Sequence, residues 1–136
     1  MHKAWATHYG IAFREPAAFK VDASVPAMAC LAADRQGALV PCCRRLFELI
    51  FVEGATLDVP MIEALPTQLG LDPVAFRRDL GSVETSARHQ ALIDEAHARG
   101  AFGVPTFFLG GRMFWGNDRL PLLESALRGV ALPGWR

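Results

Sequence analysis

The chain has 136 residues, 51% of them hydrophobic, and its 14 lysines and arginines balance 14 aspartates and glutamates. This length fits one domain with its own core, and the balanced charge gives no support for binding of nucleic acid. No apolar run reaches the ~18 residues that a membrane-spanning helix needs, and residues 1–5 lack the start of a secretory signal. We therefore expect a cytoplasmic protein that binds neither nucleic acid nor membranes.

The three cysteines match no redox or metal motif. Cys30, Cys42 and Cys43 are odd in number, and none lies in a Cys-x-x-Cys arrangement. Adjacent residues on a helix point about 100° apart, so Cys42 and Cys43 lack the geometry to chelate one metal ion. The sequence thus predicts no metal site and no thioredoxin-type redox chemistry. It favours small buried side chains in a reducing compartment.

Helices dominate the first hundred residues. Their patterns cover residues 1–9, 26–37, 39–53, 59–69, 73–80 and 82–99. Asp58, Asp72 and Ser82 precede three of them as N-terminal caps, and glycines end most of them. The pattern at 39–53 is the most amphipathic. Pro66 lacks an N–H and clashes one turn back, which predicts a kink or an early stop in the pattern at 59–69.

Two short apolar runs flank Gly110-Gly111. Because glycine permits φ > 0 at the central positions of a tight turn, the runs predict a β-hairpin. Asn117 or Asp118 is then expected to cap a final helix. The sequence therefore predicts a helix-dominated α+β fold, with one domain over 1–136. Its helical subdomain covers 1–99, and the hairpin with the last helix covers 100–136.

Gly103-Val104-Pro105, just ahead of an apolar strand, resembles the cis-proline loop of thioredoxin-fold proteins. The run Phe-Trp-Gly-Asn-Asp-Arg-Leu at 114–120 is similar to the glutathione-dependent DsbA-like branch, which includes 2-hydroxychromene-2-carboxylate isomerases and kappa-class glutathione transferases. Residues 5–99 resemble the helical domain that this family inserts into its thioredoxin fold. The resemblance implies a partial thioredoxin-like fold with a cis peptide bond between Val104 and Pro105.

The resemblance also implies a glutathione site at Val104, Pro105, Asn117 and Asp118. In the family, the residue before the cis-proline holds the cysteinyl backbone of glutathione, so the N–H and C=O of Val104 should face outward and pair with it. Asn117 and Asp118 suit the γ-glutamyl end. There, exposed N–H groups attract a carboxylate, and Asp118 pairs with the α-ammonium group. A plain helix cap without a ligand is the alternative for Asp118.

Members of this family begin with a strand, a loop bearing serine or Cys-x-x-Cys, a helix and a second strand. We find no counterpart in these 136 residues, and the resemblance therefore assigns no catalytic residue here. Ser24, the first serine in the chain, does not lie in such a loop between a strand and a helix, so we assign it no catalytic role. Three functions stay open: a non-catalytic or glutathione-binding module, a glutathione-dependent isomerase or transferase of small aromatic compounds completed by a partner chain, and a disulfide oxidoreductase. The lack of Cys-x-x-Cys disfavours the third.

The strand Thr106, Phe107, Phe108, Leu109 carries a prediction about assembly. In the thioredoxin fold its neighbour is the first strand, and without that neighbour its edge exposes unpaired N–H and C=O groups. A lone two-stranded hairpin is marginal in water. We therefore expect a homodimer in which this strand pairs with its own copy in a four-stranded sheet. The alternative is that a helix or the N-terminal segment covers the edge.

Overall fold

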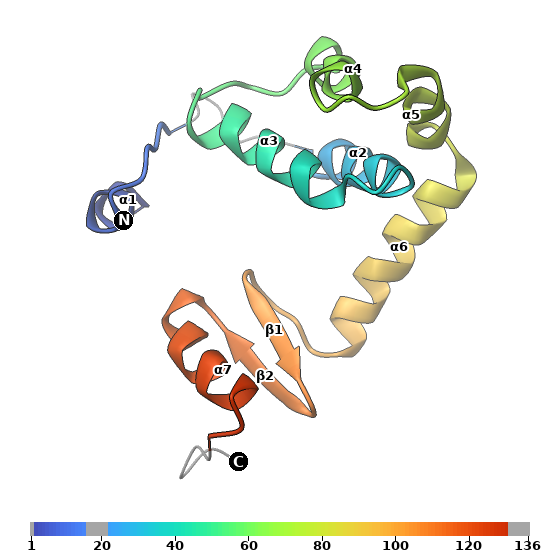
Figure 1. Ribbon diagram of the computed structural model, residues 1–136. Helices are drawn as coiled ribbons and strands as arrows, with labels where there is room; N and C mark the ends of the chain where they lie inside the picture. The colour runs from blue at the N-terminus through green and yellow to red at the C-terminus, as the bar shows by residue number, and fades with distance from the viewer. Residues whose placement is uncertain (1, 16–21, 131–136) are drawn as a thin grey trace. The chain divides into compact units, whose positions relative to one another are not determined.

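The computed structural model describes residues 2–15 and 22–130, and Figure 1 shows its helices and single hairpin. The elements are α1 (His2–Tyr9), α2 (Ser24–Asp34), α3 (Leu39–Phe51), α4 (Val59–Gln68), α5 (Pro73–Leu80), α6 (Val83–Ala98), β1 (Thr106–Leu109), β2 (Arg112–Trp115), the 3-10 helix η1 (Asn117–Arg119) and α7 (Leu120–Leu127). The predicted helix-dominated α+β class is confirmed. Met1, which the sequence assigns to the first helix, lies outside the described residues. Over the described ranges, every helix is too short or too polar to cross a membrane.

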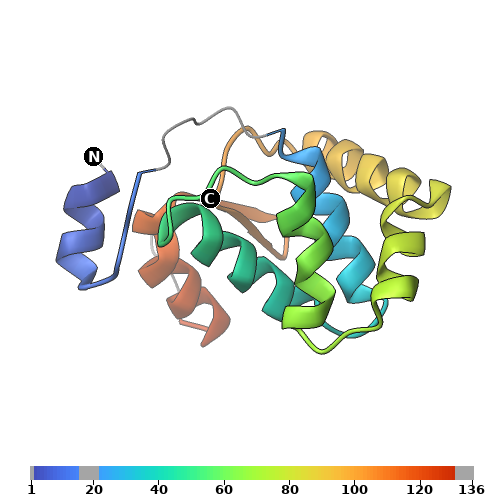
Figure 2. The same cartoon turned by 90° about the horizontal axis from the view of Figure 1, so that it is seen from above.

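The chain divides into two compact units, Met1–Ala91 and Leu92–Arg136, and the division falls within α6. In the first unit, α2 packs against α3, α4 and α5 (Figures 1 and 2). Three alanines of α2, Ala29, Ala32 and Ala33, are fully buried, and such small side chains let the neighbouring helices approach closely. Larger core side chains come from the helices around it, namely Leu46, Leu49, Ile62, Leu65 and Phe76.

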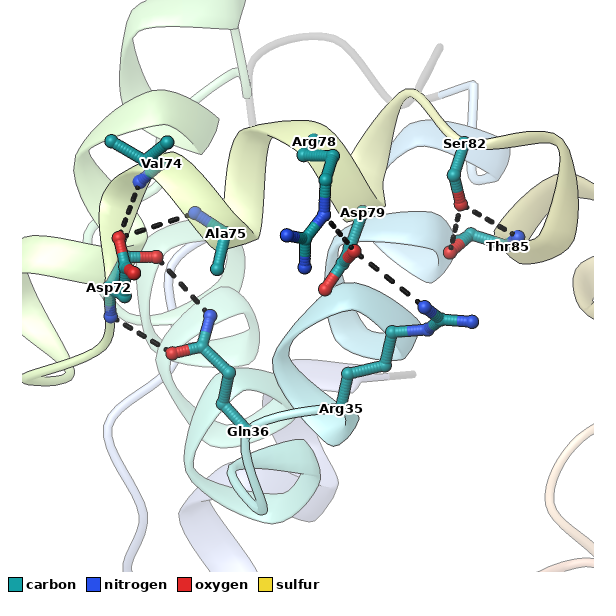
Figure 3. Close-up of polar contacts among 9 residues, drawn as sticks. All are labelled: Arg35, Gln36, Asp72, Val74, Ala75, Arg78, Asp79, Ser82 and Thr85. Carbon is teal, nitrogen blue, oxygen red and sulfur yellow. Dashed lines mark hydrogen bonds and ion pairs between the residues drawn. The ribbon is translucent and has the colours of Figure 1, made fainter.

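Polar contacts join the α2–α3 turn to the start of α5 (Figure 3). The Asp72 carboxylate accepts the N–H groups of Val74 and Ala75 at 2.8 and 3.2 Å, which makes it the cap predicted for this helix. The Gln36 side chain completes the junction. Its amide nitrogen donates to the Asp72 carbonyl at 3.2 Å, and its oxygen accepts the Asp72 N–H at 2.9 Å.

Replacing Asp72 with alanine is expected to lower the free energy of unfolding by about 1 kcal/mol, because two N–H groups lose their acceptor. Asp72→Asn is the control, since an asparagine oxygen caps equally well. Urea denaturation followed by circular dichroism measures both. Equal destabilisation by the two substitutions would show that the carboxylate charge, and not the cap, holds the junction.

A second polar cluster surrounds a buried carboxylate. Asp79 of α5 is only 4% exposed, yet two arginines reach its Oδ1: Arg78 Nε at 3.0 Å and Arg35 Nη1 at 3.7 Å (Figure 3). The buried carboxylate is thereby paired, which offsets part of the penalty of taking it out of water. One turn later, the Ser82 hydroxyl accepts the Thr85 N–H at 3.1 Å and caps α6, as the sequence predicts.

Of the kink or early stop predicted at Pro66, the early stop does not occur. α4 continues past Pro66 to Gln68, and Asp58 caps its start by accepting the Met61 N–H at 2.9 Å. Pro66 lies near the end of the helix, and its ring is fully buried. We infer that burial of this ring in the core offsets the missing N–H, so the helical path is kept for its last residues.

The second unit contains the hairpin and α7. β1 and β2 pair antiparallel in a register that runs from Thr106↔Trp115 to Leu109↔Arg112. Gly110 adopts φ +51° at the tight turn between them, as a glycine turn requires. Phe114 is fully buried, and α7 packs against β1. The hairpin therefore has one face covered by its own unit.

Candidate functional site

The loop ahead of β1 contains a cis peptide bond between Val104 and Pro105, which confirms the sequence prediction. α6 ends where Gly100 turns with φ +83° and its N–H donates to the His97 carbonyl at 2.9 Å. The Thr106 hydroxyl donates to the Gly103 carbonyl and closes the loop from its other side. The loop is thus held at both ends by contacts within a few residues.

Val104 stands out from the surface at the tip of this loop. Its side chain is 93% exposed, the highest value among the large hydrophobic residues that the structure describes. Within the described ranges, neither its N–H nor its C=O takes part in a hydrogen bond. Because backbone groups are rarely left both buried and unpaired, these two are available to water or to an extended ligand.

One hydrogen bond joins the cis-proline loop to the turn that follows β2. The Gly116 N–H donates to the Pro105 carbonyl at 2.9 Å, which extends the hairpin ladder by one pair. Gly116 has φ +97°, and a Cβ atom there would lie 2.6 Å from Asp118 Oδ1. The positive φ favours glycine at 116, and any side chain there would also displace the Asp118 carboxylate. Asn117 and Asp118 follow directly from the residue bonded to Pro105.

The predicted capping role of Asn117 and Asp118 is wrong. Together with Arg119 they form η1, and no side chain caps either η1 or α7. Backbone carbonyls replace the cap, because Gly116 and Asn117 accept the N–H groups of Arg119 and Leu120. Pro121, at the start of α7, has no N–H to offer a cap, and the Asp118 side chain is 70% exposed. Its carboxylate lies beside Arg119, whose Nε is 3.7 Å from Oδ2.

Aromatic side chains support the loop from one side. The Trp115 ring lies 4.8 Å from the Phe102 ring, measured between centroids. Its indole also contacts the Gly103 backbone so closely that a Cβ at 103 would come within 2.7 Å of Nε1. Sequence reasoning missed the supporting roles of Gly103 and Gly116. The available signal was a glycine two positions before Pro105 and another directly before Asn117.

Ser24 and the three cysteines lie in the first unit of the chain. The Ser24 hydroxyl donates to Asp22 Oδ1 at 2.6 Å, and this bond lowers the pKa of the Asp22 carboxyl. Burial raises the pKa of the Cys43 thiol to about 11, and hydrogen bonding to Cys42 raises the pKa of Cys30. A raised pKa keeps a thiol protonated and unreactive at neutral pH. The same contact lowers the pKa of Cys42, but that thiol is fully buried.

A model of the DSBA-like thioredoxin domain matches residues 2–128. The chain belongs to the DsbA-like thioredoxin family. A 2-hydroxychromene-2-carboxylate isomerase of Pseudomonas putida is 42% identical over 83 residues, which are 60% of this chain and 41% of that protein. Another, of Sphingobium xenophagum, is 29% identical over 124 residues, which are 90% of this chain and 63% of that protein.

The solved structure of a 2-hydroxychromene-2-carboxylate isomerase matches this DsbA-like chain with a TM-score of 0.81 and 33% identity. The match covers 93% of this chain and 62% of that one. The resemblance to the isomerase branch and the partial thioredoxin-like fold are therefore confirmed. The chain spans less than two thirds of the length of each of these relatives.

Proposed function

We propose that this chain is the glutathione-binding part of a 2-hydroxychromene-2-carboxylate isomerase-like protein, and that it turns over no substrate by itself. The observation that carries the proposal is the hydrogen bond from Gly116 to Pro105. It joins the loop that bears the unpaired backbone of Val104 to the turn that bears Asn117 and Asp118. A tripeptide with a charged γ-glutamyl end fits that combination.

Each part of glutathione then has a complementary group. The cysteinyl N–H and C=O pair with the backbone of Val104 in the manner of an added strand. Pro105 holds the loop through its carbonyl bond to Gly116. The α-ammonium group pairs with the exposed Asp118 carboxylate, and Asn117 offers amide groups to the α-carboxylate.

Asp118→Asn is expected to weaken glutathione binding by about tenfold or more, because a charge-assisted hydrogen bond contributes roughly 1.5–3 kcal/mol. Glu124→Gln is the matched control, since it removes an exposed carboxylate of the same unit, one that pairs with Arg128. Isothermal titration calorimetry compares the wild type with both variants.

Cysteinylglycine, which lacks the γ-glutamyl group, gives the second arm of this experiment. Its affinity is expected to be the same for wild type and Asp118→Asn. A wild type that binds no glutathione contradicts the proposal as a whole. An Asp118→Asn variant that binds glutathione as tightly as Glu124→Gln contradicts the role of Asp118.

A second candidate is a glutathione-dependent isomerase or transferase of small aromatic compounds, completed by further chain or by a partner. The isomerase names of the relatives favour it, and so does the large part of the solved isomerase that this chain does not match, since the match covers 62% of that protein. A chromophoric aromatic electrophile separates the two candidates. Glutathione-dependent turnover by the chain alone, lost in Asp118→Asn, favours the second. A disulfide oxidoreductase is not proposed, because the 136 residues contain no Cys-x-x-Cys.

We also propose a cytoplasmic setting, which the three unbonded cysteines support because reducing compartments keep thiols free. The homodimer through β1 is likewise a proposal. Among the described residues, β1 pairs only with β2. Because Gly116 donates to Pro105, the alternation of an antiparallel ladder makes Phe107↔Phe114 a bonded pair. The backbone groups of Thr106 and Phe108 then point to the opposite edge, where a second copy of β1 can pair with them.

A further inference from the structure

Two cysteines that are distant in sequence meet between α2 and α3. Cys30 Sγ lies 3.3 Å from Cys43 Sγ, although the residues are 13 positions apart. α2 and α3 pack side by side in both views of the molecule (Figures 1 and 2). The buried alanines of α2 allow this close approach. A disulfide needs about 2.05 Å between the sulfurs, so only a small further shift separates the pair from bonding distance.

The third cysteine of this cluster differs from the other two in its access to solvent. Cys30 and Cys43 are partly exposed, whereas Cys42 is fully buried. A small reagent from solvent can therefore reach the pair, whereas Cys42, which contacts Cys30, is closed to solvent. Burial raises the pKa of Cys43 to about 11, so the pair is mostly protonated at neutral pH and reacts slowly.

We propose that Cys30 and Cys43 form a reversible oxidation site, at which a small-molecule disulfide such as glutathione disulfide converts the two thiols into a bond between α2 and α3. One thiolate attacks the small disulfide, a mixed disulfide forms, and one glutathione thiolate leaves. The second thiolate attacks the protein sulfur of the mixed disulfide and releases the other glutathione. The protein loses two protons and two electrons, and the small disulfide becomes two thiols.

This proposal does not rest on the glutathione site proposed at Val104 and Asp118, because its observations are contacts within the first unit. The expected consequence of this disulfide is a change in thermal stability. A bond between residues 13 positions apart restricts the unfolded chain and holds the helical hairpin closed. Oxidation is therefore expected to raise the melting temperature by about 5 °C or more, and a reducing agent reverses the rise.

The experiment incubates the whole chain with glutathione disulfide, unfolds it in denaturant while the remaining thiols are blocked by alkylation, and maps the peptides by mass spectrometry without reduction. We expect a Cys30–Cys43 link, a loss of two hydrogen masses and an alkylated Cys42. A link to Cys42, a stable glutathione adduct without any link, or three alkylated thiols would overturn the proposal.

Single variants test the assignment. Cys42→Ala is expected to form the link as the wild type does, whereas Cys30→Ala and Cys43→Ala should carry glutathione on the thiol that remains and show no rise in melting temperature. Circular dichroism confirms that each variant is folded. The wild-type peptide map decides the pairing even where a variant does not fold. A link that forms equally without Cys30 or without Cys43 contradicts the site.

Discussion

Replacing Phe76 with alanine is expected to lower the free energy of unfolding of the helical unit by about 3–5 kcal/mol. The Phe76 side chain is 1% exposed and is among the largest fully buried side chains described. It belongs to the core cluster that α2, α3, α4 and α5 build together. The truncation loses the transfer free energy of the ring and leaves a cavity that the rigid helices around it fill only in part.

Val74→Ala is the matched control for Phe76→Ala, because it shortens a side chain on the same helix that is 77% exposed. Its effect on stability is expected to stay within about 0.5 kcal/mol. Urea denaturation followed by far-ultraviolet circular dichroism measures both variants. A Phe76→Ala protein as stable as Val74→Ala would show that α5 contributes little to this core.

Phe108→Pro is expected to convert the proposed homodimer into a monomer at micromolar concentration. Proline has no N–H, so the substitution removes the donor that Phe108 directs toward a second copy of β1 and leaves the ladder to β2 in place. Two symmetric hydrogen bonds are lost per dimer, each contributing about 0.5–1.5 kcal/mol. The dissociation constant should therefore rise by about tenfold or more.

Met113→Pro is the matched control, since Met113 pairs with Phe108 in the register and its N–H points from β2 to the other edge of the hairpin. Static light scattering over a concentration series is expected to show a dimer for wild type and Met113→Pro, and a monomer for Phe108→Pro. A wild type that stays monomeric at micromolar concentration contradicts the proposed homodimer. Equal dissociation by the two proline variants would place the interface elsewhere.

The register of the hairpin distinguishes the residues of β1 that face the core from those that do not. In the sequence, Thr106, Phe107, Phe108 and Leu109 form one apolar run, and every member is an equal candidate for the interface. The structure pairs Phe107 with the fully buried Phe114. Phe108 lies on the opposite face, where the Arg99 guanidinium sits 4.1 Å from its ring centre. A charged residue at 107 would therefore disturb the core of the unit and would not report on the dimer.

Local patterns predicted most of the helices and the hairpin. Helical periodicity, the caps at Asp58, Asp72 and Ser82, and the glycine turn at 110 act within a few residues, so the sequence carries them directly. The cis bond at Val104-Pro105 was predicted from the resemblance of this loop to the cis-proline loop of thioredoxin-fold proteins, and the residues that carry that resemblance are adjacent in the chain. The capping role predicted for Asn117 and Asp118 was wrong. Backbone carbonyls in η1 already accept the N–H groups that a side-chain cap would bind, and Pro121 has no N–H.

Tertiary structure alone decided which distant groups meet. The bond from Gly116 to Pro105 depends on the register of the hairpin, and the contact of Cys30 with Cys43 depends on how closely two helices pack. No short sequence motif predicts either contact. Each one joins two segments whose distance depends on how the residues between them pack. By itself the sequence determined the elements and the residue types of the candidate site. Packing and register determined that the Val104 loop adjoins the Asp118 turn and that two thiols lie within reach of one bond.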